Sequence, residues 1–124
     1  MGTWGIGIKD NDTASDVYAD LISLLETTSI EQAMEKMTVF YRSKIHSHEE
    51  QNNFWLAVAS AQMDTNTLQT DIFDRVQKLI LSGQDLVLWQ ELKARETDLN
   101  LRKEALSDFL MLLTEYKNRL ANEI

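Results

Sequence analysis

Hydrophobic residues recur at intervals of three and four along most of the chain, the spacing that places apolar side chains on one face of an α-helix. The sequence contains no proline and only four glycines, so the helix ends have to be inferred from capping residues. Thr13, Ser29 and Ser47 each stand three positions before a carboxylate or amide side chain, as in a capping box. Together these patterns predict about five to six helices, over residues 14–26, 30–45, 48–63, 70–83, 85–92 and 97–121.

The third predicted helix is expected to lie at the centre of the fold, because its run 54–59 is apolar on nearly all sides. The second helix carries an apolar stripe that includes Met37, Phe40 and Tyr41. Gly83 is expected to end the fourth helix in the left-handed conformation that glycine adopts at low cost. The residues expected in the core are Leu21, Trp55, Val58, Val76, Leu79, Trp89, Leu106, Phe109 and Leu113.

The last predicted helix has an apolar seam that continues from Leu106 to Leu120, and Arg102 fills one polar position in it. Such a seam forms a coiled coil only when it is sustained over several heptads, and this one is short. We therefore expect it to pack on the core of its own chain. The fold class is all-α, a compact bundle forming one domain over residues 1–124, with a short Gly-containing extended segment over 3–8.

Composition narrows the possible functions. The chain has 124 residues, which is enough for a single core, and it has no cysteine for a disulfide or a thiolate metal site. It lacks both an uninterrupted apolar run of membrane-spanning length and a secretory leader, so we expect a cytoplasmic protein without a membrane partner. A net charge of −8 argues against nucleic-acid binding, because phosphate contacts need a basic face.

Motifs that carry chemistry are incomplete. Gly5 and Gly7 lack the third glycine of a dinucleotide-binding fingerprint. His48 begins a sequence similar to the zinc-protease signature, but Asn52 stands where the second histidine is required. His46 and His48 form a His-x-His pair that we interpret as part of a solvated turn, with adventitious metal binding as the alternative. The sequence therefore predicts a protein without enzymatic activity, cofactor or metal.

Acidic residues are concentrated near the N-terminus. Residues 9–35 contain seven acids and one base, so this segment accounts for −6 of the total charge of −8. One interpretation is a solvated face, and the other is a patch that attracts a basic protein partner. The candidate partner-binding residues are Asp10, Asp12, Asp16, Asp20, Glu31 and Glu35. Tyr18 or Tyr41 is expected to act as the aromatic anchor of such an interface.

Several short motifs are distributed over most of the chain. They are the opening Trp-Gly-x-Gly of residues 4–7, the Asn-Asp-Thr-Ala of 11–14, the Asn-Phe-Trp-Leu-Ala of 53–57 with Gln62, the Ser-Gly-Gln-Asp-Leu of 82–86 with Trp89, and the Arg-Lys of 102–103 with Leu106 and Phe109. In these motifs the chain resembles a family of small, uncharacterised bacterial cytoplasmic proteins. That family is associated with the gene neighbourhoods of polymorphic toxins, where small acidic proteins act as immunity partners.

This resemblance implies an immunity protein that binds one cognate toxin, expected to be a basic effector domain, and neutralises it by occlusion. The alternative is a non-catalytic helical adaptor or regulatory protein that forms a homodimer through its C-terminal helix. The first hypothesis predicts a monomer with an exposed acidic surface, whereas the second predicts that the seam of the last helix is buried between two copies.

Overall fold

The computed structural model describes residues 7–122, and within this range it contains seven helices and no strand. The helices are α1 (Asp12–Leu25), α2 (Ile30–Phe40), α3 (Arg42–Ile45), α4 (Gln51–Asp64), α5 (Thr70–Leu81), α6 (Gln84–Glu91) and α7 (Glu96–Asn122). The all-α prediction is confirmed, with one more helix than the upper number expected. Most of the extended segment predicted over 3–8 lies outside the described residues, and Gly7 and Ile8 belong to a turn.

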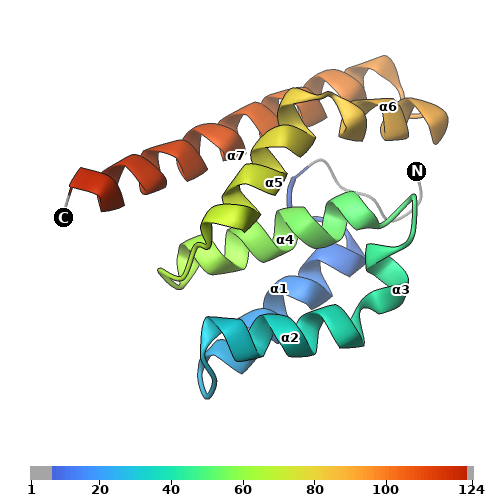
Figure 1. Cartoon of the computed structure of the whole chain (residues 1–124). Coiled ribbons are helices and arrows are strands. Elements are labelled where there is room, and N and C mark those ends of the chain that lie inside the picture. The colour runs from blue at the N-terminus through green and yellow to red at the C-terminus, as the bar shows by residue number, and fades with distance from the viewer. Residues whose placement is uncertain (1–6, 123–124) are drawn as a thin grey trace.

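Helix α4 lies in the middle of the molecule, as predicted. It packs against α1 on one side and against α5 on the other, while α2 and α7 lie at opposite edges (Figure 1). Ten of its 14 residues are buried, including Ala57, Ala59 and Ala61. Small side chains allow two helices to approach closely, and the packing between α1 and α4 is the most extensive in the fold. The result is a layered arrangement rather than a closed ring of helices.

Two of the predicted helix ends are confirmed. The Ser29 side chain accepts a hydrogen bond of 3.2 Å from the backbone N–H of Gln32 and so caps α2. Gly83 follows the C-cap of α5 with φ of 76°, the left-handed conformation expected of it. A residue with a Cβ at this position would be strained by the backbone angle alone.

Two other helix starts differ from the prediction. Asn11, not Thr13, caps α1, because its side chain accepts a 2.8 Å hydrogen bond from the N–H of Ala14. Helix α4 begins at Gln51, three residues later than expected. The predicted cap Ser47 does bind the N–H of Glu50, at 3.3 Å, but there it closes a turn that precedes the helix.

The single helix predicted over 30–45 is wrong, since it is divided into α2 and α3 at Tyr41. Tyr41 has φ of −99° and ψ of 23°, outside the α-helical region. Its ring stacks on Phe54 of α4, with 5.8 Å between the ring centroids, and its hydroxyl donates a hydrogen bond to Asp20 of α1. These tertiary contacts hold the Tyr41 backbone away from the helical path, and local spacing carries no sign of them.

The predicted core residues are buried with one exception, Trp55. Phe54 is fully buried, whereas the next residue around α4, Trp55, is only partly buried. Successive residues of a helix point about 100° apart, so only one of these two rings can face the centre. The guanidinium carbon of Arg75 lies 4.2 Å from the centroid of the Trp55 ring and covers part of it.

The seam of the last predicted helix packs within the monomer, as expected. Leu106, Phe109, Leu113 and Tyr116 are buried, and α7 packs against α5 and α6. The seam ends earlier than predicted, because Leu120 is 38% exposed. No helix formed by residues 7–122 is long and apolar enough to cross a lipid bilayer.

The polar position in this seam holds a buried ion pair. Arg102 of α7 is fully buried, and its Nε donates a 2.8 Å hydrogen bond to Oδ2 of Asp85 on α6, which is only 1% exposed. The guanidinium also donates to the carbonyl of Gly7 at 3.3 Å. Its carbon lies 4.9 Å from the ring centroid of Trp89, close enough for a cation–π interaction.

The ion pair extends into a polar network that reaches the central helix. Asn52 of α4 donates from its side-chain amide to Oδ1 of Asp85 at 3.3 Å. Gln84 in turn donates to the side-chain carbonyl of Asn52 at 3.1 Å. The network therefore connects α4, α6, α7 and the turn at Gly7, which fixes how the C-terminal part of the chain sits on α4.

Candidate partner-binding surface

A groove of about 690 Å³ runs between α1 and α2 on the outer side of the molecule. Its lining residues are Asp20, Ser23, Leu24, Glu35, Lys36, Met37, Val39 and Phe40. The two helices lie side by side at the lower edge of the molecule in Figure 1, on the opposite side of α4 from α7. We call this groove, together with the acidic residues Asp16, Asp20 and Glu35 beside it, the α1–α2 surface.

The α1–α2 surface exposes two large apolar side chains next to each other. Val39 is 70% exposed and Phe40 is 76% exposed. The sequence pattern had placed Phe40 in the buried stripe of the second helix, and this prediction is wrong. Because α2 ends at Phe40 and Tyr41 takes the inward position, the Phe40 ring points outward. The Phe40 and Tyr41 rings pack edge to face, with 5.0 Å between their centroids. Adjacent exposed apolar side chains are typical of binding sites.

The structure brings some of the six candidate acidic residues together and leaves others apart. Asp20 of α1 and Glu35 of α2 line the same groove, and Asp16 lies one turn before Asp20 on the same side of α1. Glu31 does not line this groove. It lines a second groove, of about 390 Å³, on the other flank of α2, to which Glu35 also contributes.

The two remaining candidates lie near the beginning of α1. The side chain of Asp10 accepts a 2.9 Å hydrogen bond from the N–H of Gly7 and closes a local turn. Asp12 is the exposed first residue of α1, two turns of helix before Asp20 and about 12 Å from it along the axis. The groove itself is therefore flanked by Asp16, Asp20 and Glu35.

Neither tyrosine proposed as an anchor is freely exposed. Tyr41 is only 8% exposed, and the partly buried Tyr18 donates a 2.6 Å hydrogen bond to Asp64. Phe40 is the aromatic side chain that stands beside the acidic residues in the open. The local sequence does not distinguish the two residues, because Phe40 and Tyr41 are adjacent aromatics. Only the tertiary fold determines that Tyr41 is buried and Phe40 is exposed.

Tyr41 ties the acidic side of α1 to the end of α2. Burial raises the pKa of its hydroxyl, and so do the hydrogen bond to Asp20 and the negative charges of Asp20 and Asp16. The hydroxyl therefore keeps its proton over the whole physiological range and acts as a donor that orients the Asp20 carboxylate. A fixed carboxylate loses less conformational entropy when it pairs with a partner's cation.

The Tyr41→Phe variant is expected to lose stability at neutral pH and to respond less to alkali. The raised pKa means that the Tyr41 contribution is fully present below about pH 10, the usual pKa of tyrosine, and is lost as the pH rises toward its folded-state pKa. Urea unfolding between about pH 8 and pH 11.5 should show a shallower decline for the variant than for the wild type. Tyr18→Phe, which removes a more exposed hydrogen bond, is the control and should change the slope less. Equal slopes for Tyr41→Phe and wild type would contradict the assignment.

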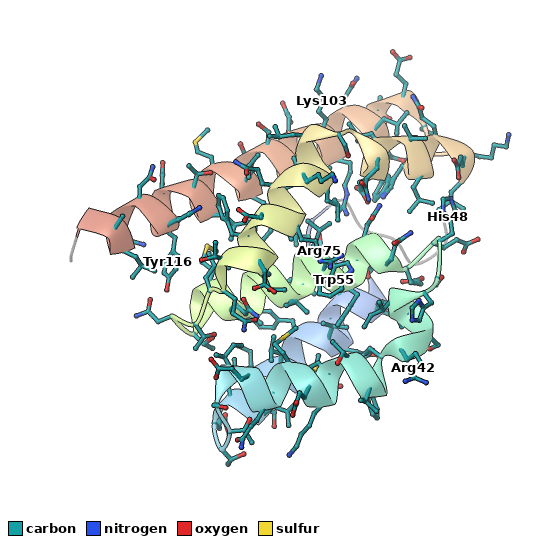
Figure 2. The ribbon with its side chains drawn as sticks, in the orientation of Figure 1. Arg42, His48, Trp55, Arg75, Lys103 and Tyr116 are labelled. Carbon is teal, nitrogen blue, oxygen red and sulfur yellow. The ribbon has the colours of Figure 1, made fainter. Side chains whose placement is uncertain are left out.

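A polar surface adjoins the second groove at the junction of α4 and α5. Figure 2 shows Arg75 of α5 lying next to Trp55 of α4, in agreement with the 4.2 Å contact between them. Both residues line the second groove and a third one, of about 540 Å³, which extends toward Lys78 and Gln84. The third groove is lined by two acids, Asp71 and Asp74, and two bases, Arg75 and Lys78, so its charges balance.

The histidine pair lies at the exposed junction before α4. The Nε2 atom of His48 is 2.9 Å from Oε2 of Glu91 on α6, and both side chains are more than half exposed. Among residues 7–122, no group of three or more His, Cys, Asp or Glu side chains is arranged to hold a metal ion. The geometry is that of an exposed hydrogen bond between the two side chains.

Comparison with known proteins gives no match that identifies the chain. No family model matches it, and neither a curated protein nor a solved structure shows significant similarity to it.

Proposed function

We propose that this chain is an immunity protein, a non-catalytic protein that binds a basic bacterial toxin domain and blocks it by occlusion. The observation that carries the proposal is the α1–α2 surface, where the exposed side chains of Val39 and Phe40 stand beside the carboxylates of Asp20 and Glu35. Protein interfaces combine an apolar anchor with a polar rim in this way. The resemblance to proteins from toxin gene neighbourhoods supplies the class of partner.

Electrostatics supports a basic partner. Most of the net charge of −8 comes from residues 9–35, which form α1 and the first half of α2. A toxin that acts on nucleic acid carries a basic surface for its substrate, and an acidic protein both reaches that surface quickly and covers it. Occlusion of this kind requires no catalytic group on the inhibitor.

Neutralising the acidic surface is expected to slow toxin capture. The variant Asp16→Asn, Asp20→Asn, Glu31→Gln and Glu35→Gln keeps side-chain shape and removes like charges four residues apart on both helices. The amide oxygen introduced at position 20 still accepts the Tyr41 hydrogen bond, although more weakly than the carboxylate, so the two effects oppose each other and the fold should be retained. The variant's association rate with a basic toxin domain, sought in the gene immediately upstream, should fall by about tenfold or more at about 50 mM salt. The wild-type rate should fall toward the variant's rate as salt rises to about 500 mM. Stopped-flow kinetics and rescue of cells expressing the toxin provide the measurements.

A matched control separates this surface from net charge alone. Glu96, Glu104, Asp108 and Glu115 are four exposed acids on α7, and neutralising them changes the total charge by the same amount. This control should keep most of the wild-type association rate. If both quadruple variants slow association equally, the effect comes from overall charge. If the α1–α2 variant associates and rescues as well as the wild type, the acidic residues form only a solvated face.

The adaptor hypothesis is less favoured. A homodimer through the C-terminal helix would need an unpartnered seam, but Leu106, Phe109, Leu113 and Tyr116 pack inside the monomer. The large apolar side chains of α7 that remain exposed are Leu101, Met111 and Leu112, each about half exposed, and Leu120, which is 38% exposed. Their positions do not follow the three- and four-residue spacing of a heptad seam, so they offer a weak basis for pairing through a coiled coil.

A further inference from the structure

We infer that the occupant of the α1–α2 groove is an amphipathic helix of the partner protein, with an apolar stripe flanked by lysine or arginine. The inference rests on the proposed function only in taking the partner to be a basic protein. It adds the form of the binding element and the place where it docks.

The shape of the groove suits a helix. Helices α1 and α2 are antiparallel neighbours joined by the short turn 26–29 (Figure 1). The apolar residues that line the groove between them are the exposed Val39 and Phe40, the partly buried Leu24 and the buried Met37. A third helix laid into such a groove buries anchors spaced three and four residues apart. The residues of α2 that line the groove run from Glu35 to Phe40, about 8 Å along the helix axis, which accommodates one to two turns of a docking helix.

The charges beside the groove select a basic helix. Asp20 and Glu35 stand on opposite helices at its two edges, Asp16 adds a third carboxylate, and Lys36 is the one base among the lining residues. The C-terminal end of α2 at Phe40 adds the partial negative charge of its last carbonyl groups. A helix with cations on both sides of its apolar stripe would pair with both edges at once.

The same charges disfavour other occupants. Nucleic acid and anionic lipid headgroups would be repelled by the carboxylates. A second copy of the chain, placed symmetrically on this surface, would bring Asp20 and Glu35 against the same residues of its partner. A small molecule would be poorly enclosed, because Val39 and Phe40 project into solvent instead of closing over the groove.

The test uses a fluorescein-labelled peptide of about 18 residues, built from leucine and lysine so that the leucines form one helical stripe. Fluorescence anisotropy measures its binding to the full chain. A Val39→Ser, Phe40→Ser variant should bind it at least about tenfold more weakly, as expected when a central apolar anchor is lost. Asp20→Asn, Glu35→Gln should also bind more weakly and with less dependence on salt. A peptide of the same composition without the stripe, and a leucine–glutamate helix with it, should bind poorly.

Leu101→Ser, Leu112→Ser is the matched control, because it removes two exposed apolar side chains from α7 and leaves the groove intact. Equal weakening by this control, or unchanged binding by the Val39→Ser, Phe40→Ser variant, would overturn the inference. Sedimentation velocity that shows wild-type self-association abolished by Val39→Ser, Phe40→Ser would also overturn it, by making a second copy the occupant. Binding to the cognate toxin domain, sought in the neighbouring gene, separates this inference from the proposed function. If the toxin still binds the Val39→Ser, Phe40→Ser variant, the groove is not the binding site, and the proposed immunity function stands. If the wild-type chain binds the peptide but not the toxin, the groove does bind a basic helix, and the immunity function is wrong.

Discussion

The Asp85→Ala variant is expected to melt roughly 10–20 °C below the wild-type protein, corresponding to a loss of about 3–5 kcal/mol. The Asp85 carboxylate accepts the hydrogen bond from Arg102 Nε at 2.8 Å, and both side chains are almost completely buried. Removing the carboxylate leaves a positive charge in the interior after its counter-charge has gone. The lost hydrogen bond from Asn52 adds to the cost. Thermal unfolding followed by circular dichroism provides the measurement.

The exposed ion pair between Arg95 and Asp98 is the matched control. Its Nε–Oδ2 distance of 3.1 Å is similar, but the Arg95 side chain is 82% exposed. Arg95→Ala should therefore change the free energy of unfolding by less than about 1 kcal/mol. The double variant Asp85→Leu, Arg102→Met should recover part of the loss, because it removes both charges and keeps apolar volume. An Asp85→Ala variant as stable as Arg95→Ala would show that the buried pair contributes little to holding α6 and α7 on α4.

The buried pair also illustrates which parts of the fold follow from local sequence. The apolar spacing and the capping residues Ser29 and Gly83 act within a few residues of themselves, so helices and several of their ends could be predicted. Arg102 stood out as a polar residue in an apolar seam. Its partner Asp85 is 17 positions away on another helix, and no local pattern pairs the two.

The α1–α2 surface could be predicted only in part, because local spacing determines which side of a helix a residue lies on but not what it faces. The spacing of Asp16 with Asp20, and of Glu31 with Glu35, places each pair on one side of its helix. That Asp20 and Glu35 flank one groove depends on how α1 and α2 turn toward each other. The exposure of Phe40 depends on the break at Tyr41, which is imposed by contacts with Asp20 and Phe54.

Phe54→Ala is expected to cost about 3–5 kcal/mol, and Trp55→Ala only about 1–2 kcal/mol, although tryptophan is the larger residue. Phe54 is fully buried in α4 and its ring stacks on Tyr41, so its loss leaves a cavity at the junction of α2, α3 and α4. Trp55 is partly buried and partly covered by Arg75, and solvent can replace much of what its truncation removes. Urea unfolding of both variants gives the comparison. A larger loss for Trp55→Ala would mean that the tryptophan, as the sequence pattern alone suggested, forms the core of α4. If Phe54→Ala costs more, as expected, Trp55 and Arg75 can be changed without unfolding the chain. Phe54 then holds Tyr41 in its inward position, and this position leaves the neighbouring Phe40 exposed.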